Sequence, residues 1–331
     1  MSRRARLLAA FVVLAGLVLA GCGGYDDTVV GPPDAVETTP AAPATTPAAC
    51  VSDTNPTRSY EPTGPLPSPG GFPSGSAMGQ IYDRGRLIAG VSADTYLLAS
   101  NNPFTGQIEG FDIDMVEQVA EAIFGDPKAY ELRVITAGDR ITALQDRRVD
   151  VVVRNMTISC VRWQSIAFSA EYYRSGQKVL VRSDLADGQG PLVDTPAELA
   201  GLRVCAPTGT SSLDNIKKLS PQATVVEAAN HTGCLALFQQ GAVDAITGDD
   251  TVLAGLATQD PYAVVPEQKA FSAEPYGIGV NAEDVDLVRF INGVLERMRA
   301  DGSWKASYEK WLAPTLGGGA TQPQPVYGRT P

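Results

Sequence analysis

The sequence predicts an α/β protein built from two lobes, and three observations lead to this prediction. Short apolar runs rich in β-branched residues alternate with amphipathic stretches between residues 86 and 312. The alternation restarts after residue 200, which gives two βαβ sets of roughly 100 residues each. A content of 44% hydrophobic and 19% charged residues is typical of a globular chain with one or two domains. In such folds, ligands bind in the crevice at the carboxyl ends of the strands.

The individual elements follow from local patterns. The clearest helix places Val116, Val119, Ala120 and Ile123 on one face and ends at Gly125, a residue that favours a helix stop. Apolar β-branched runs predict strands over 86–92, 130–135, 149–155, 178–182, 202–207, 223–228, 243–249 and 276–281. Helical periodicity predicts the helices 110–125, 140–148, one from about 212, 234–240, 285–300 and 304–312.

The N-terminus reads as an export signal rather than as part of the fold. "MSRRAR" is basic, and the apolar run that follows has 14 residues, whereas a spanning helix needs about 20. "LAGC", ending at Cys22, resembles a bacterial lipobox, which implies cleavage before Cys22 and lipidation of its sulfur. The alternative is an ordinary secretory signal with a chance cysteine. We therefore expect a lipoprotein signal peptide over 1–21 and a membrane-anchored chain after it.

The remaining chain divides by composition. Eleven of the 24 prolines lie between Pro32 and Pro73, which predicts a flexible linker over 22–78. The expected lobes are lobe 1 over 79–182, lobe 2 over 183–273, a return to lobe 1 over 274–316, and a flexible tail over 317–331. Loss of three arginines with the signal takes the net charge from −11 to −14. So acidic a chain is a poor candidate for binding nucleic acid.

Four cysteines remain beside the lipidated one, and an even number in an exported protein suggests two disulfides. Their wide spacing is unlike that of a metal site. Cys205 lies in the predicted strand 202–207, and Cys234 begins the predicted helix 234–240. Because this strand and this helix lie close in the sequence, we expect the two cysteines to pair. Cys50 and Cys160 then form the second bridge.

The motifs of the two lobes resemble one known family. "GFDIDMVEQVA", "DRITALQDRRVDVVVRNMTISCVRWQSIAFSAEYY", "VCAPTGTSS", "GAVDAITGDDTVLAG" and "YGIGVNAEDVDLVRFINGVLE" are similar, in order and spacing, to the polar amino-acid-binding proteins of bacterial ABC importers. More narrowly, the chain resembles the glutamine-binding lipoproteins of mycobacteria and their relatives. The resemblance implies a two-lobed type II periplasmic-binding-protein fold with a ligand cleft between the lobes.

The resemblance also implies a function. We expect a monomeric receptor on the outer face of the cytoplasmic membrane, with no cofactor, no metal and no catalytic residues. Its ligand would be a free acidic or amide L-amino acid, namely glutamate, aspartate, glutamine or asparagine. Its partner would be an ABC permease or a membrane sensor. Two alternatives remain: an enzyme on the same fold, such as a dehydratase, or a structural lipoprotein with a vestigial cleft.

An amino acid needs a fixed cation for its carboxylate and a fixed anion for its ammonium. Arg162 stands at the position that the family uses for the α-carboxylate, flanked by Thr157 and a main-chain group near Asn155. From these residues alone, a solvated loop arginine is the alternative. Asp249 matches the family's α-ammonium acceptor, and we interpret its neighbour Asp250 as structural.

Further candidates come from two segments. "TGTSS" supplies Thr210 and Ser211 at a strand-to-helix turn, where backbone amides can hold an anion and a plain N-cap is the alternative. The first strand supplies Ser92, Asp94 and Tyr96, whose register a one-residue slip would change.

Arg140 and His231 are candidates for the ligand side chain. In some acidic-amino-acid binders of the family, the position of Arg140 faces the cleft. In some glutamate- and aspartate-binding relatives, a histidine at the position of His231 contacts the side-chain carboxylate, so both together would indicate an acidic ligand. The alternatives are a surface arginine at a helix start and a solvated loop histidine. If His231 contacts a carboxylate, the affinity for acidic ligands should weaken between roughly pH 6 and pH 8, because an unperturbed histidine has a pKa of ~6.5.

Overall fold

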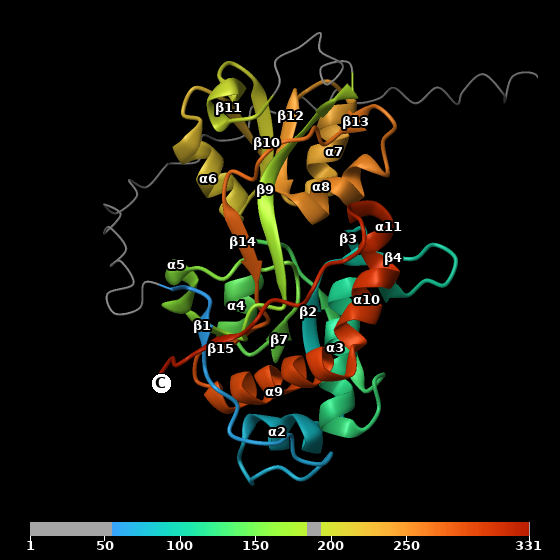
Figure 1. Ribbon diagram of the computed structural model, residues 1–331, viewed down its shortest axis with the longest axis vertical. Helices are drawn as coiled ribbons and strands as arrows, with labels where there is room; N and C mark the ends of the chain where they lie inside the picture. The colour runs from blue at the N-terminus through green and yellow to red at the C-terminus, as the bar shows by residue number, and fades with distance from the viewer. Residues whose placement is uncertain (1–54, 184–192, 331) are drawn as a thin grey trace, which may run out of the picture. The chain divides into compact units, whose positions relative to one another are not determined.

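The computed structural model describes residues 55–183 and 193–330, and two α/β sheets dominate it (Figure 1). The first has the order β6-β2-β7-β15-β8, in which the first three strands are parallel and β15 is antiparallel to both neighbours. Its strands are β2 (Leu87–Val91), β6 (Tyr130–Val134), β7 (Val151–Val152), β8 (Ile166–Phe168) and β15 (Gly279–Asn281). We call the part built on this sheet lobe 1.

The second sheet has the order β11-β10-β12-β9-β13 and defines lobe 2. Strands β10, β11 and β12 are parallel, as the sequence predicts, whereas β9 is antiparallel to β12. The strands are β9 (Tyr173–Arg182), β10 (Arg203–Pro207), β11 (Thr224–Ala228), β12 (Ala245–Asp249) and β13 (Ala263–Val264). Strand β14 (Ala273–Tyr276) pairs with the first half of β9, so these two strands carry the chain between the lobes.

Six helices, α3, α4, α6, α7, α9 and α10, lie where the periodicity predicts them, whereas α2, α5 and α8 were not predicted. In α3, the four residues Val116, Val119, Ala120 and Ile123 are at most 1% exposed, and Gly125 caps the helix with φ +73°. The helices are α2 (Ala77–Arg84), α3 (Phe111–Phe124), α4 (Arg140–Gln145), α5 (Cys160–Trp163), α6 (Ser211–Leu219), α7 (His231–Gln239), α8 (Asp250–Ala257), α9 (Val285–Asp301), α10 (Ser303–Trp311), α11 (Ala313–Leu316) and the 3-10 helix η2 (Pro196–Leu199).

The core of lobe 1 is aromatic where α3 meets α10. Phe111 packs edge-on against Trp304 with ring centroids 5.8 Å apart, and Trp304 stacks on Tyr308. In lobe 2, the predicted disulfide between Cys205 and Cys234 is confirmed, and both cysteines are fully buried. The bridge ties β10 to α7 inside the core of that lobe.

The second predicted disulfide lies partly outside the described residues. Cys160 is disulfide-bonded, but its expected partner Cys50 falls in the range 1–54, as do Cys22 and the signal peptide. None of the helices within 55–183 and 193–330 is long and apolar enough to cross a membrane.

The two ends of the described chain differ from the expected flexible linker and tail. β1 (Arg58–Ser59) and β16 (Val326–Tyr327) pair in parallel. Tyr60 is 7% exposed, and the Arg329 guanidinium lies 3.8 Å from the ring centre of Trp163 at the end of α5. The composition suggested disorder, but backbone pairing and aromatic contacts hold residues from both ends against lobe 1.

A small sheet completes the fold. β3 (Asp94–Thr95), β4 (Ala99–Asn101) and β5 (Ile108–Glu109) form three antiparallel strands between β2 and α3. Short strands of this kind carry too little periodicity to be predicted from the sequence.

Candidate functional site

Arg162 lies in the four-residue helix α5, whose N-cap is Ser159. The residue is only 9% exposed, so the alternative of a solvated loop arginine is wrong. Its Nη1 donates to the carbonyl of Thr157 at 2.6 Å, and its Nη2 donates to the carbonyl of Gly209 at 3.4 Å. Burial lowers the pKa of Arg162, and the negative charges of Glu274 and Asp249 oppose that shift. The guanidinium is therefore a buried cation close to two carboxylates.

Asp249 ends β12 in lobe 2 and is 4% exposed. Its Oδ2 accepts a hydrogen bond from the Tyr276 hydroxyl at 2.7 Å. Burial, and next the charge of Glu274, raise the pKa of Asp249 to about 7. Its neighbour Asp250 accepts from the Ser175 hydroxyl and from the backbone amide of Thr251 in α8, which is the structural role expected for it.

Two further buried arginines lie beside Arg162. Arg140 is 3% exposed and Arg154 is 6% exposed, and the charges of Arg162 and Arg154 add to burial in lowering the pKa of Arg140. The alternative of a surface arginine at position 140 is therefore wrong. Among the residues that the structure describes, the hydrogen bonds of all three guanidinium groups go to backbone carbonyls, which leaves their positive charge uncompensated by direct contact with this part of the chain. Such a group suits the anionic or carbonyl oxygens of a ligand.

Gly209 is where the backbones of the two lobes come close. Its carbonyl accepts from both Arg140 and Arg162, at 3.0 and 3.4 Å. A Cβ at Gly209 would lie 2.7 Å from the Cα of Gly138, and the φ of +75° already favours glycine. The following Thr210 is the N-cap of α6, because its Oγ1 accepts from a backbone amide at 3.1 Å. The structure thus gives Thr210 a capping role.

Thr157 was predicted beside the ligand carboxylate and Ser211 at a turn that can hold an anion, and both donate to one oxygen of Glu274, each at 2.6 Å. Asn155 adopts a φ of +36°, and its backbone amide donates to Asp112 at 2.8 Å. Its side-chain Oδ1 is buried, and no hydrogen-bond partner for it exists within the described ranges. A buried acceptor of this kind is unusual and suits a ligand donor.

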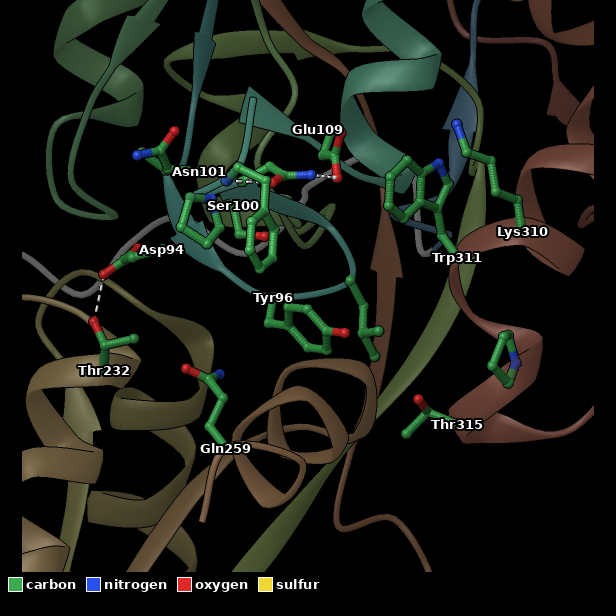
Figure 2. A pocket seen from close by; sticks show the side chains of 16 residues that line it. Asp94, Tyr96, Ser100, Asn101, Glu109, Thr232, Gln259, Lys310, Trp311 and Thr315 are labelled. Atoms are coloured by element: carbon green, nitrogen blue, oxygen red, sulfur yellow. Dashed lines mark hydrogen bonds between the residues drawn. The ribbon is translucent and has the colours of Figure 1, made fainter. Parts of the chain in front are cut away.

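The candidates that follow the first strand, Ser92, Asp94 and Tyr96, do not share one environment. Ser92 is 1% exposed and donates to Asp94, whose other oxygen accepts from Thr232 of lobe 2. Tyr96 is 47% exposed and points into a separate cavity of about 560 Å³, which Asp94, Thr232 and Trp311 also line (Figure 2). Arg162 and Asp249 are not among the lining residues of that cavity. Tyr96 and Asp94 thus line a cavity to which Arg162 and Asp249 do not contribute.

His231 begins α7 rather than lying on a loop, so the alternative of a solvated loop residue is wrong. Its Nε2 is buried and lacks a hydrogen-bond partner in the part of the chain that the structure describes. Burial, and next the charge of Arg154, lower the pKa of His231 to about 4. The imidazole is neutral at pH 7. The expected change of affinity between pH 6 and pH 8 therefore cannot come from protonation of this residue in the unliganded protein.

Sequence reasoning missed Glu274, Arg154 and Tyr276. Arg154 directly follows the apolar run of the predicted strand over 149–155, beside the candidate Asn155, so its position gave a usable signal. Glu274 and Tyr276 belong to β14, which the sequence analysis did not predict as a strand before residue 276.

Residues 87–314 match the bacterial extracellular solute-binding proteins, family 3. The chain is 35% identical over 233 residues to a glutamine-binding ABC-transporter protein of Bacillus subtilis, covering 70% of this chain and 83% of that protein. It is 38% identical over 202 residues to a glutamine-binding protein of Geobacillus stearothermophilus, with coverage of 60% and 74%. A glutamate-binding protein of Corynebacterium efficiens is 30% identical over 253 residues, with coverage of 73% and 83%.

Solved structures agree with the fold. The arginine-binding protein of T. maritima, in its holo form, superposes with a TM-score of 0.61 at 30% identity, covering 70% of this chain and 98% of that one. An ancestral arginine-binding protein bound to glutamine gives a TM-score of 0.63 at 29% identity, with coverage of 69% and 98%. The family match spans both lobes and the segments that carry Arg162 and Asp249. The chain therefore belongs to family 3 of the bacterial extracellular solute-binding proteins and has their two-lobed α/β fold.

Proposed function

We propose that this protein is a lipid-anchored extracytoplasmic receptor that binds one acidic or amide amino acid between its lobes. The observation that carries the proposal is the burial of a guanidinium and a carboxyl from different lobes, Arg162 from lobe 1 and Asp249 from lobe 2. A free amino acid carries a carboxylate and an ammonium on the same carbon. Arg162 would bind the first and Asp249 the second, so that a bound ligand joins the lobes and favours their closed arrangement.

The groups around this pair suit a polar ligand side chain. Arg140 and Arg154 supply guanidinium donors, whereas Asn155 Oδ1 and His231 Nε2 supply acceptors. Glutamine and asparagine offer both a carbonyl and an amide, and glutamate and aspartate offer carboxylate oxygens. The relatives named as glutamine-binding and glutamate-binding proteins support the same group of ligands.

The amino acid would be delivered to an ABC permease or reported to a membrane sensor. The sequence "LAGC" supports anchoring through a lipid on Cys22. The wild type should then incorporate a labelled fatty acid and Cys22→Ser should not, and equal labelling of the two proteins would contradict the anchor.

A thermal-shift screen over the twenty amino acids tests the binding function. Binding adds RT ln(1 + [L]/Kd) to the free energy of unfolding, which is about 2.7 kcal/mol at a ligand concentration of 100 Kd. We expect one or more of glutamate, aspartate, glutamine and asparagine to raise the melting temperature by several degrees. Arg162→Ala is the matched control and should lose the shift. A screen in which none of these four shifts the wild type would refute the proposal.

A further inference from the structure

Glu274 is a buried carboxylate in β14, between the two lobes, and it is 1% exposed. Four side-chain donors surround it. Its Oε2 accepts from the hydroxyls of Thr157 and Ser211, each at 2.6 Å, and its Oε1 accepts from Ser272 at 2.6 Å and from the amide of Asn215 at 3.2 Å. Four donors around two oxygens match an ionised carboxylate, which can only accept hydrogen bonds.

The hydrogen bonds to Oε2 determine whether the hydroxyls of Thr157 and Ser211 can donate to a ligand or only accept from it. A hydroxyl has one hydrogen and two lone pairs. The hydroxyls of Thr157 and Ser211 donate their hydrogens to Glu274, and the two hydroxyl oxygens lie 3.1 Å apart. Both oxygens are therefore left as acceptors. The sequence analysis placed Thr157 beside the ligand carboxylate and Ser211 at a turn that can hold an anion, but an acceptor pair suits a donor such as an ammonium group.

The negative groups continue from this pair to Asp249. Thr157 forms a backbone bridge with Tyr276, and the Tyr276 hydroxyl donates to Asp249 at 2.7 Å. The charge of Glu274 is the largest electrostatic influence on Asp249 and also acts on Arg162. Two carboxylates and two hydroxyl acceptors thus belong to one connected part of the candidate site, which Arg162 also contacts through the carbonyl of Thr157.

We propose that Glu274 is a positioning residue for the α-ammonium of the ligand, because it turns the hydroxyls of Thr157 and Ser211 into acceptors. The proposal rests on the proposed amino-acid binding function. Glu274 reaches the ligand through these hydroxyls, one from each lobe. The arrangement is complete only when the lobes are together, so Glu274 links recognition of the ammonium to closure.

Glu274→Gln tests this role, because the donors on the Oε1 side orient the new amide. Ser272 donates to Oε1 at 2.6 Å and Asn215 donates to it at 3.2 Å, so these two donors favour the amide oxygen on that side and the amide nitrogen on the side of Thr157 and Ser211. Both hydroxyls then accept from that nitrogen and turn their hydrogens toward the ligand. The variant keeps the shape of the side chain but reverses the polarity of the two hydroxyls.

The measurement is calorimetric affinity for two probes. The first is the amino acid that gives the largest shift in the screen. The second is the same molecule with hydrogen in place of the α-ammonium, which is 4-carbamoylbutanoate for glutamine and glutarate for glutamate. We expect Glu274→Gln to weaken the amino acid about tenfold or more, since hydrogen bonds to charged groups are involved. The affinity for the analogue should stay unchanged or rise.

The controls separate positioning from structure. Glu171→Gln alters another buried glutamate, 3% exposed and paired with Arg174, and should leave the preference between the probes unchanged. If Glu274→Gln does not fold, Ser211→Ala removes one acceptor and should weaken the amino acid alone. Equal losses for both probes, or no loss for either, would overturn the role of Glu274. A wild type that binds none of the twenty amino acids would instead refute the proposed function.

Discussion

Burial of Asp249 predicts that Asp249→Asn makes the unliganded protein more stable at neutral and alkaline pH. The pKa of this carboxyl rises from 3.8 to about 7 on folding. The folded protein therefore holds a proton that the unfolded chain has lost, and the stability of the wild type falls as the pH rises from about 4 to about 7. A difference of about 3 pKa units corresponds to about 4 kcal/mol by pH 8. The asparagine variant lacks this titration and keeps an acceptor for Tyr276.

Urea unfolding of wild type and Asp249→Asn at several pH values between 4 and 8, without ligand, measures the effect. The difference in the free energy of unfolding should move in favour of the variant by about 4 kcal/mol across this range. Asp112, whose pKa burial raises to about 6, titrates in both proteins and cancels. His231, with a pKa of about 4, cancels in the same way. A difference that stays constant within about 1 kcal/mol, the size of a typical surface effect, would refute the reasoning.

The same titration affects ligand binding. Asp249 must lose its proton to accept the α-ammonium, and a bound ammonium lowers the pKa of the carboxyl. The affinity for an amino acid should therefore fall as the pH drops below about 7, by up to tenfold per pH unit, and stay level above it. Calorimetry in buffers of different ionisation enthalpy should detect nearly one proton released per ligand at pH 6. An affinity that does not change between pH 5.5 and pH 7.5 would contradict this coupling.

Three further predictions concern Arg162, the Cys205–Cys234 disulfide and Arg329 near the C-terminus. Arg162→Ala should fold normally but lose measurable amino acid binding, and Arg162→Lys should bind weakly because it lacks the planar fork, as titration calorimetry will show. Cys205→Ser should lower the free energy of unfolding by about 3 kcal/mol, because its bridge to Cys234 closes a loop of 29 residues; a urea midpoint equal to that of the wild type would contradict this. Arg329→Ala should lower the free energy of unfolding by about 1 kcal/mol and shift the fluorescence emission of Trp163, whose ring centre lies 3.8 Å from the guanidinium. An unchanged emission spectrum and urea midpoint would contradict this contact.

The sequence by itself determined the elements whose patterns are local. The apolar face of α3, from Val116 to Ile123, follows from helical periodicity and is buried as predicted. The strands β2, β6, β7, β10, β11, β12 and β15 follow from apolar runs, whereas β8, β13 and β14 were not predicted. The Cys205–Cys234 bridge follows from the closeness of a strand and a helix in the chain. Motif order was enough to identify the fold family, because a motif records the residue types at fixed spacings.

Only the tertiary structure decided the electrostatic state of the candidate site. Burial that makes Asp249 hard to ionise and keeps His231 neutral comes from side chains far away in the sequence. Glu274 has no local signal, since its donors lie up to 117 residues away. The order of the C-terminal segment depends on the pairing of β16 with β1, at the other end of the described chain. Desolvation and hydrogen bonding depend on which atoms share a space, and a linear pattern does not contain that information.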